Sequence, residues 1–158
     1  MPLTALPLVG TRLYRRVSNG TPEERAERLA RLVLADIENA PTGWLDMITD
    51  DIRMRDSLTY AEDAYIQSSR GLIRAYLRRG PDDAWRDAAR VQAPTLLVFG
   101  QRDRLVPLAV GRRAREAFPN SRLVVLPPSG HVAQIEHAQL VADQFVRFAA
   151  DVSTVAAS

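Results

Sequence analysis

The chain has 158 residues, of which 46% are hydrophobic and 25% are charged, as in an ordinary globular domain. The absence of cysteine excludes disulfides and thiol chemistry, and two histidines alone argue against a structural zinc site. All 21 basic residues are arginines, and they are spread among 19 acidic residues without a continuous stripe, which argues against a nucleic-acid partner.

The N-terminal region contains a short apolar stretch, Leu3 to Gly10. No basic residue precedes it, and it is too short to cross a bilayer, so we expect neither a secretory signal nor a membrane anchor. Together with the lack of cysteine, this favours a cytoplasmic protein that has no membrane partner.

Helical patterns occupy residues 17–90. Thr21, Pro22 and Glu24 form a capping box that starts the first helix, and apolar residues recur at helical spacing up to Ile37. A second helix is expected from Trp44 to Met54. A third begins at another capping box, Thr59 and Glu62, and ends before Gly80 as its C′ residue, and a last short helix surrounds Trp85.

Some side chains in these helices invite a functional interpretation. Four large residues of the second helix and its end could line a substrate cleft, namely Trp44, Met47, Met54 and Tyr60. Their helical spacing favours the other interpretation, in which they pack in the hydrophobic core. The nearby aspartates lack the spacing of a calcium loop, so no metal site is expected. Neither G-x-G-x-x-G nor G-K-[ST] occurs, so we expect no nucleotide cofactor. The substrate-binding residues remain unknown.

Two short apolar runs, residues 94–100 and 122–126, read as buried strands, with a helical pattern that begins at Pro107 between them. A helix that joins two buried strands is typical of a parallel β-α-β unit, which places chemistry at the carboxyl ends of its strands. Asp103 and His131 follow directly after the two strand ends, and a helix follows His131. We therefore expect the Asp103 carboxylate to reach a ring nitrogen of His131. Such a carboxylate fixes the tautomer of an imidazole that transfers protons. The other histidine, His137, has no partner at a defined spacing and is expected at the surface.

At these positions the chain resembles the C-terminal part of an α/β-hydrolase. The resemblance covers about residues 91–150 and is carried by the strand with Gly100-Gln101-Arg102-Asp103, by Val106-Pro107, by Gly130-His131 and by Glu136. It implies that Asp103 is the acid and His131 the base of a catalytic triad. It also implies that the helices before the first strand form a lid. The expected fold is therefore α/β, with residues 1–90 as the helical lid and residues 91–158 as a two-stranded remnant of the hydrolase core.

The nucleophile of that family is absent from this sequence. It sits on a G-x-S-x-G-like elbow before the lid, and no such elbow occurs here. The nearest imitation, Gln67 to Gly71, lies inside a helical pattern. We therefore expect a truncated chain that is inactive alone. In the complete enzyme it would hydrolyse an ester or related bond of a small apolar substrate.

The acid and base do not distinguish a serine nucleophile from an aspartate that attacks epoxides or haloalkanes. The alternative functions are a non-catalytic, lid-like binding module and, far behind, a nucleic-acid-binding protein. Because the neighbours of the first strand are missing from this sequence, we also expect self-association or the need for an N-terminal half.

Overall fold

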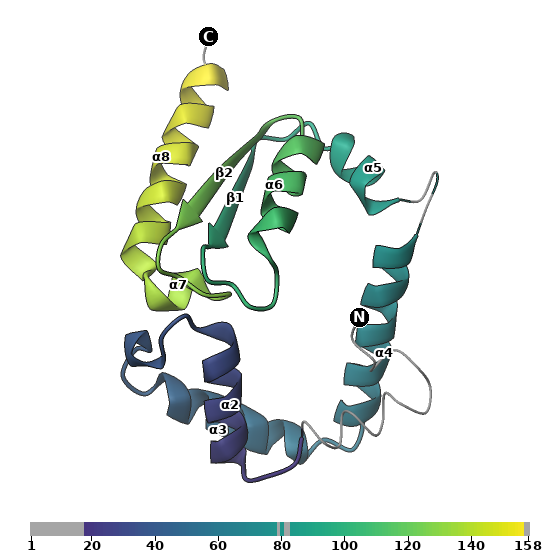
Figure 1. Cartoon of the computed structure of the whole chain (residues 1–158), viewed down its shortest axis with the longest axis vertical. Coiled ribbons are helices and arrows are strands. Elements are labelled where there is room, and N and C mark those ends of the chain that lie inside the picture. Colours follow the sequence, from purple (N-terminus) through teal and green to yellow (C-terminus); the bar gives the residue numbers. More distant parts are fainter. Residues whose placement is uncertain (1–17, 79, 81–82, 157–158) are drawn as a thin grey trace. The chain divides into compact units, whose positions relative to one another are not determined.

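The computed structural model describes residues 18–78, 80 and 83–156. Among these residues, the helical segments before the first strand are α2 (Pro22–Val33), the 3₁₀ helix η2 (Ile37–Asn39), α3 (Trp44–Asp56), α4 (Ala61–Leu77) and α5 (Ala84–Ala89) (Figure 1). They are followed by β1 (Thr95–Gly100), α6 (Leu108–Ala117), β2 (Ser121–Leu126), α7 (Ala133–Glu136) and α8 (Ala138–Ala156). The predicted order of helices, strand, helix, strand and helix is confirmed.

The first predicted capping box is confirmed at the start of α2. The backbone N–H of Glu24 donates to the Thr21 hydroxyl at 3.3 Å, and the backbone N–H of Thr21 donates to Oε2 of Glu24 at 3.0 Å. Both groups would otherwise be unsatisfied donors at the helix start. The predicted inner face of this helix is also largely buried, with Ala26 1% and Ala30 0% exposed.

The second predicted capping box, at Thr59 and Glu62, is wrong. Helix α4 begins at Ala61, its N-cap is Tyr60, and no side chain caps it. The N–H of Ala61 donates instead to the carbonyl of Leu58 at 3.1 Å, in a turn that follows the end of α3. The helix thus starts one residue too late for Thr59 and Glu62 to meet.

The two strands pair in parallel, as predicted. Their register runs from Thr95 opposite Ser121 to Gly100 opposite Leu126, and they form a two-stranded sheet within the part of the chain that the structure describes. Helix α6 connects them and contacts both strands. The parallel register brings both carboxyl ends to one edge of the sheet.

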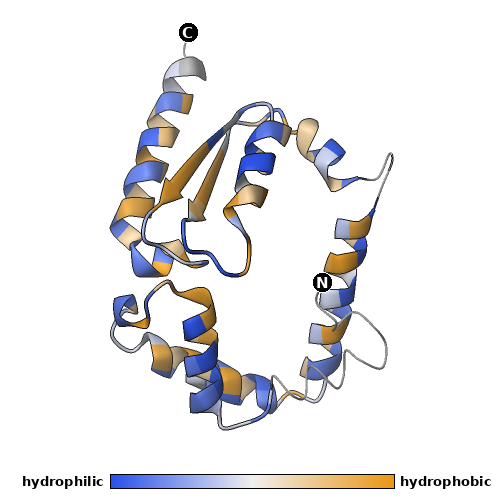
Figure 2. Cartoon of the chain, viewed as in Figure 1, coloured by the Kyte–Doolittle hydropathy of each residue, from blue (hydrophilic) through white to orange (hydrophobic). Residues whose placement is uncertain are grey.

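The strands are coloured as hydrophobic over most of their length in Figure 2, and α6 and α8 lie on either side of them in Figure 1. Gly111 of α6 packs against Phe99, since a Cβ atom at Gly111 would come 2.9 Å from the phenyl ring. The expectation of buried strands is only partly met. Gly100 and Leu126 are buried, but the residues between Thr95 and Gly100 are half-buried.

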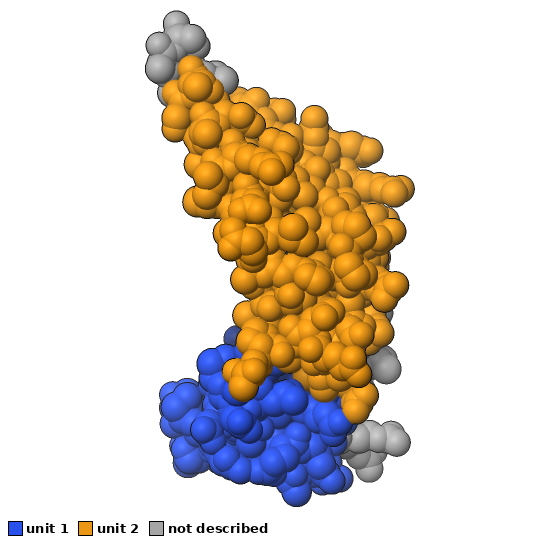
Figure 3. Space-filling model, turned by 90° about the vertical axis from the view of Figure 1, so that its left-hand side faces the viewer, with its two compact units in different colours: residues 1–29, 43–84 blue, residues 30–42, 85–158 orange. Residues whose placement is uncertain are grey.

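Contacts divide the chain into two compact units, coloured separately in Figure 3. The first takes the residues up to Leu29 and then Gly43–Ala84, and the second takes Ala30–Thr42 and Trp85–Ser158. Within the first unit, Arg25 of α2 donates to both carboxylate oxygens of Asp56, at 2.9 and 2.6 Å. The functional division into a lid of residues 1–90 and a core of residues 91–158 stays a prediction, and residues 30–42 group with the strands by contact.

None of the helices in the described part of the chain is long and apolar enough to cross a membrane. The apolar stretch from Leu3 to Gly10 lies outside the described residues.

Candidate active site

The structure brings Asp103 and His131 together at the carboxyl edge of the sheet. Asp103 lies just past the end of β1 and His131 just past the end of β2. Atom Oδ2 of Asp103 is 2.9 Å from Nδ1 of His131, although 28 residues separate the two in sequence. This distance lies within the hydrogen-bonding range predicted from the sequence.

The Asp103 carboxylate is held in one orientation by backbone donors. The N–H groups of Leu105 and Val106 both donate to its Oδ1 at 2.8 Å, which leaves Oδ2 free to accept from His131. The carboxylate side chain is 5% exposed, whereas the His131 side chain is 38% exposed. The Asp103 carboxylate is therefore shielded and fixed, while the His131 imidazole remains accessible from solvent.

Two opposing effects act on the pKa of Asp103. Burial alone would raise it, because a low-dielectric environment disfavours the charged form. Hydrogen bonds from Val106, from the His131 ring and from Leu105 outweigh burial and hold the pKa of Asp103 below its ordinary value. The carboxylate is thus ionised at neutral pH and can accept from the ring.

This hydrogen bond determines which imidazole nitrogen is available for chemistry. Because an ionised carboxylate can only accept, the neutral ring of His131 carries its proton on Nδ1. The other nitrogen, Nε2, then has a free lone pair and can take a proton from a nucleophile or from water. Asp103 would also stabilise the imidazolium that forms in this step.

The loops that carry the two residues are joined by their backbones. The N–H of Arg102 donates to the carbonyl of Ser129 at 2.8 Å, and the N–H of Gln101 donates to that of Leu126 at 3.1 Å. The peptide bond between Pro127 and Pro128 in the second loop is cis. The two hydrogen bonds hold the segments that follow β1 and β2 against each other.

Both loops are also attached to the α2 end segment, residues 31–36, which belongs to the same compact unit. The N–H of His131 donates to the carbonyl of Val33 at 2.7 Å. From the other loop, the guanidinium of Arg104 donates to the carbonyl of Arg31 at 2.6 Å. The last turn of α2 thus supplies acceptors to the loops of both Asp103 and His131.

Glu136 is a site residue whose contacts the sequence did not reveal. Its side chain is buried, at 9% exposed, and its carboxylate accepts from the N–H of Gly130 at 2.5 Å. The other oxygen accepts from Ala35 at 2.9 Å and from Asp36 at 3.2 Å. Its position five residues after His131 was the one sequence feature that indicated a role for Glu136. Its donors on the α2 end segment lie about 100 residues earlier in the chain, so their contact with Glu136 could not be predicted.

The expectation that His137 lies at the surface is wrong. The residue is half-buried, and its Nε2 atom is buried without a hydrogen-bond partner among the described residues. His137 lies between α7 and α8, where the chain turns into the long helix. The sequence pattern gave no indication of this packing.

The serines closest to a nucleophile motif are poorly placed for attack. Ser129 is 0% exposed, so its hydroxyl is shielded from any substrate. The segment Gln67–Gly71 lies inside helix α4, as its pattern predicted, with no strand before it. A nucleophile elbow requires an exposed side chain on a strand-to-helix turn. Ser129 lies between β2 and α7 but is buried, and the segment Gln67–Gly71 has no strand before it.

Three of the four large side chains that could line a cleft or form the core are exposed. Met47 is 60%, Met54 59% and Tyr60 62% exposed, whereas Trp44 is half-buried. The core interpretation is therefore wrong for Met47, Met54 and Tyr60.

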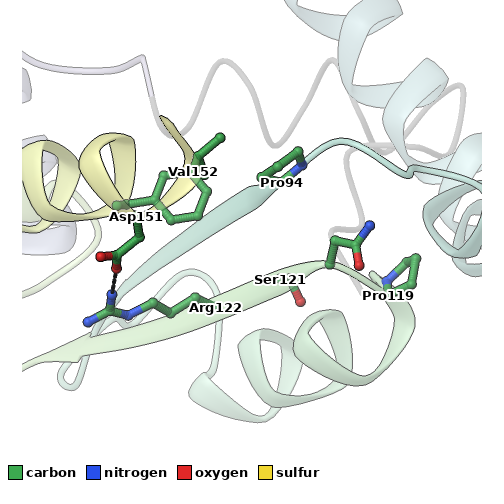
Figure 4. A pocket seen from close by; sticks show the side chains of 8 residues that line it. Pro94, Pro119, Ser121, Arg122, Asp151 and Val152 are labelled. Carbon is green, nitrogen blue, oxygen red and sulfur yellow. Dashed lines mark hydrogen bonds and ion pairs between the residues drawn. The ribbon is translucent and has the colours of Figure 1, made fainter. Parts of the chain in front are cut away.

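A pocket of about 680 Å³ lies at the other end of the sheet. It is lined by residues next to the amino ends of both strands, among them Pro94 and Ser121, and by Phe148 and Val152 of α8 (Figure 4). Because Asp103 and His131 lie beyond the carboxyl ends, this pocket is not the cleft that serves them. Within the residues that the structure describes, no group of three or more acidic, histidine or cysteine side chains could hold a metal ion.

The sequence matches the family model of the alpha/beta hydrolase fold over residues 21–138. Over 138 residues it is 29% identical to 2-hydroxy-6-oxononadienedioate/2-hydroxy-6-oxononatrienedioate hydrolase 2 of Pseudomonas putida, covering 87% of this chain and 46% of that protein. Hydrolase 1 of the same name and organism is 27% identical over 153 residues, covering 97% of this chain and 50% of that protein. The chain thus spans about half the length of the curated relatives it matches.

Among solved structures, the fold is similar to that of a mutant of a meta-cleavage product hydrolase (CumD), with a TM-score of 0.61 and 17% identity. The likeness covers 85% of this chain and 48% of that one. At this identity the likeness concerns the fold alone.

Proposed function

The chain belongs to the alpha/beta hydrolase fold family, and on this premise we propose that Asp103 and His131 are the acid and the base of a hydrolase active site. The observation that carries the proposal is the 2.9 Å hydrogen bond between Oδ2 of Asp103 and Nδ1 of His131. The two backbone donors on Oδ1 support it, because they direct the remaining oxygen toward the ring.

The proposed chemistry is proton transfer at Nε2 of His131. This nitrogen takes the proton of an attacking hydroxyl or water as the new bond to the substrate forms. It then returns the proton to the leaving group as the old bond breaks. With a serine nucleophile, these proton transfers lead to hydrolysis of an ester or a related bond. With an aspartate nucleophile, His131 instead activates the water that hydrolyses the covalent intermediate.

We propose that the nucleophile comes from a part of the enzyme that this sequence does not contain. No G-x-S-x-G elbow occurs in the chain, and Ser129 is buried. Loss of the elbow also removes one donor of the oxyanion hole. The chain alone should therefore not turn over substrate, although it carries an oriented acid and base.

We propose a small apolar molecule as the substrate, as the sequence predicts. The names of the two Pseudomonas putida relatives suggest a different candidate, the dicarboxylates 2-hydroxy-6-oxononadienedioate and 2-hydroxy-6-oxononatrienedioate. Short-chain esters, an epoxide and a haloalkane represent the other reactions open to an acid and base of this geometry.

A non-catalytic binding module is the second candidate function. It is favoured by the exposed apolar side chains of α3 and α4, such as Met47 at 60% and Leu72 at 70% exposed. Apolar side chains that gather on a surface are typical of a surface that binds a partner or ligand.

The two functions differ in turnover. The chain would be assayed alone and together with the N-terminal half of a relative that carries the elbow, supplied in trans or fused in frame. We expect hydrolysis only when that half is present, and we expect His131→Ala or Asp103→Asn to remove most of it. Turnover by the chain alone that survives His131→Ala would refute the assignment. Stoichiometric binding without turnover in the restored protein would favour the binding module.

A further inference from the structure

We propose that Glu136 is a positioning residue for His131. Its buried carboxylate ties the turn before His131 to the α2 end segment, and this keeps Nδ1 of the ring on Asp103. The inference rests on the proposed function, since the position of the ring matters for chemistry only where His131 is the base.

The contacts of Glu136 span two segments distant in sequence. One carboxylate oxygen accepts from the N–H of Gly130, the residue directly before His131, at 2.5 Å. The other accepts from the N–H groups of Ala35 and Asp36, at 2.9 and 3.2 Å. A single side chain therefore receives donors from the base loop and from the end of α2.

A second set of hydrogen bonds joins the same two segments directly, from backbone to backbone. The N–H groups of His131 and Val132 donate to the carbonyl of Val33, at 2.7 and 3.4 Å. The backbones approach so closely that a Cβ atom at Gly130 would come 2.5 Å from the nitrogen of Ala35. Together, Glu136 and these backbone contacts hold the loop of Gly130 and His131 closely against the α2 end segment.

The chemistry of this position requires a carboxylate of this length. All three partners are N–H donors, so both side-chain oxygens must accept, and a carboxylate offers no competing donor. Glutamine would place its NH₂ group against the donors on one side. Aspartate would keep both acceptors but is one methylene shorter and could not span the two segments.

The ring of His131 depends on this support. Its side chain is 38% exposed, so packing restrains it little, and the Nδ1 contact with Asp103 holds one side of the ring. If Gly130 is released from Glu136, the backbone that carries the ring keeps its hydrogen bonds to the Val33 carbonyl but loses its second anchor. It can then shift, while Asp103 stays fixed by Leu105 and Val106. The hydrogen bond between the ring and the carboxylate should then be lost in part of the molecules.

The two histidines of the chain allow a direct test by NMR. With ¹⁵N-labelled histidine, the averaged shifts of Nδ1 and Nε2 report which nitrogen of the neutral ring carries the proton, and His137→Gln assigns the signals. At about pH 9, where an ordinary imidazole is neutral, the unaltered chain should show His131 protonated on Nδ1. Glu136→Gln should move the shifts toward a mixture of tautomers. The ratio of Nδ1-protonated to Nε2-protonated ring should fall roughly tenfold or more, in line with the loss of a hydrogen bond to a charged group.

Glu116→Gln is the matched control, because it makes the same change at an exposed site on α6 and should leave the His131 shifts unaltered. A folded Glu136→Gln chain with the His131 shifts of the unaltered protein would overturn the inference. If Glu136→Gln melts below the working temperature, Glu136→Asp provides the same readout with the same two outcomes.

A double substitution separates positioning from a general structural role. In an Asp103→Asn background the ring has lost its carboxylate, so adding Glu136→Gln should change the shifts much less than it does in the unaltered chain. An equal change in both backgrounds would contradict the inference. Because none of these readouts requires turnover, a failure of the proposed hydrolase activity would be recognised separately.

Discussion

Gly100 and Gly130 meet backbone to backbone at the edge of the sheet. A Cβ atom at Gly100 would come 2.0 Å from the carbonyl oxygen of Gly130 and 2.4 Å from that of Ser129. The close approach allows the loop after β1 to hydrogen-bond directly to the loop after β2, and so brings Asp103 within reach of His131. An ordinary side chain cannot be accommodated without moving one of these loops.

Gly100→Ala should therefore destabilise the chain and separate Asp103 from His131. Overpacking against side chains costs about 1–3 kcal/mol, and backbone atoms yield less than side chains do, so we expect at least this loss in the free energy of unfolding. Urea denaturation would measure it. Gly71→Ala is the opposite control, because Gly71 lies inside α4 with nothing within 4 Å of its Cβ position, and alanine there should stabilise by about 0.5–1 kcal/mol. Equal stability of Gly100→Ala and the unaltered chain would contradict the close packing.

Asp103→Asn should reverse the tautomer of His131. The N–H groups of Leu105 and Val106 both point at Oδ1, so the amide oxygen of asparagine should take that position. The NH₂ group then faces the ring and must donate to Nδ1, which moves the ring proton to Nε2. Histidine ¹⁵N shifts would report the change, with Asp46→Asn on α3 as the control. A ring that keeps its proton on Nδ1 would show that the amide is oriented the other way.

The ionised Asp103 should stabilise the chain in a limited pH range. Its pKa in the folded chain lies below the ordinary value of 3.8, so the folded state binds this proton less readily than the unfolded state. The stabilisation is fully present above the ordinary pKa and is lost as the pH falls through the lowered pKa of the folded state.

The free energies of unfolding of the unaltered chain and of Asp103→Asn should therefore be compared below about pH 5, where an ordinary imidazole is already protonated. As the pH falls further, the difference between the two should shrink in favour of the variant. Urea unfolding at a series of pH values measures both curves, and other carboxylates contribute equally to each. Curves that remain parallel into the acid range would mean that the pKa of Asp103 is not lowered by folding.

The chain alone should self-associate as its concentration rises. Phe145 and Val146 of α8 are 63% and 64% exposed, and the half-buried strands belong to a sheet of two strands in the described part of the chain. Exposed apolar side chains and open strand edges favour association. Sedimentation velocity over a range of concentrations should show growing species, and Phe145→Glu with Val146→Glu should reduce them.

Ala142→Glu, at an exposed alanine of α8, adds a charge without removing a large apolar side chain and should have a weaker effect. A single monomeric species at every concentration would rule out this association.

The strand ends were predictable because their signals are local. A short apolar run between Pro94 and Gly100 can form a strand whatever surrounds it, and the same holds for the run that ends at Leu126. Once both strands are parallel, geometry alone places Asp103 and His131 at one edge. The contact between Asp103 and His131 thus follows from two local patterns and one topological rule.

The support around the pair was not predictable in this way. Glu136 accepts from Ala35, which lies 101 residues earlier, and no local pattern encodes a partner at that distance. The exposure of Met47 and Met54 has a similar explanation, since helical spacing defines an apolar face but not whether another element covers it. Thr59 does not cap α4, because the turn after α3 ends with the N–H of Ala61 bonded to the carbonyl of Leu58 and α4 begins only at Ala61.

Residues 30–42 group with the strands, and this determines where a chimera between relatives should be joined. If the predicted lid were exchanged as one block up to about residue 90, the exchange would replace the Val33 carbonyl and the Ala35 and Asp36 amides. These groups hydrogen-bond to His131 and Glu136. Junctions after Thr42 and after Ala84 would instead transplant residues 43–84 and leave these partners in place. The end of α2 would then stay with the histidine that it contacts, and a different segment 43–84 could be grafted without changing the surroundings of His131.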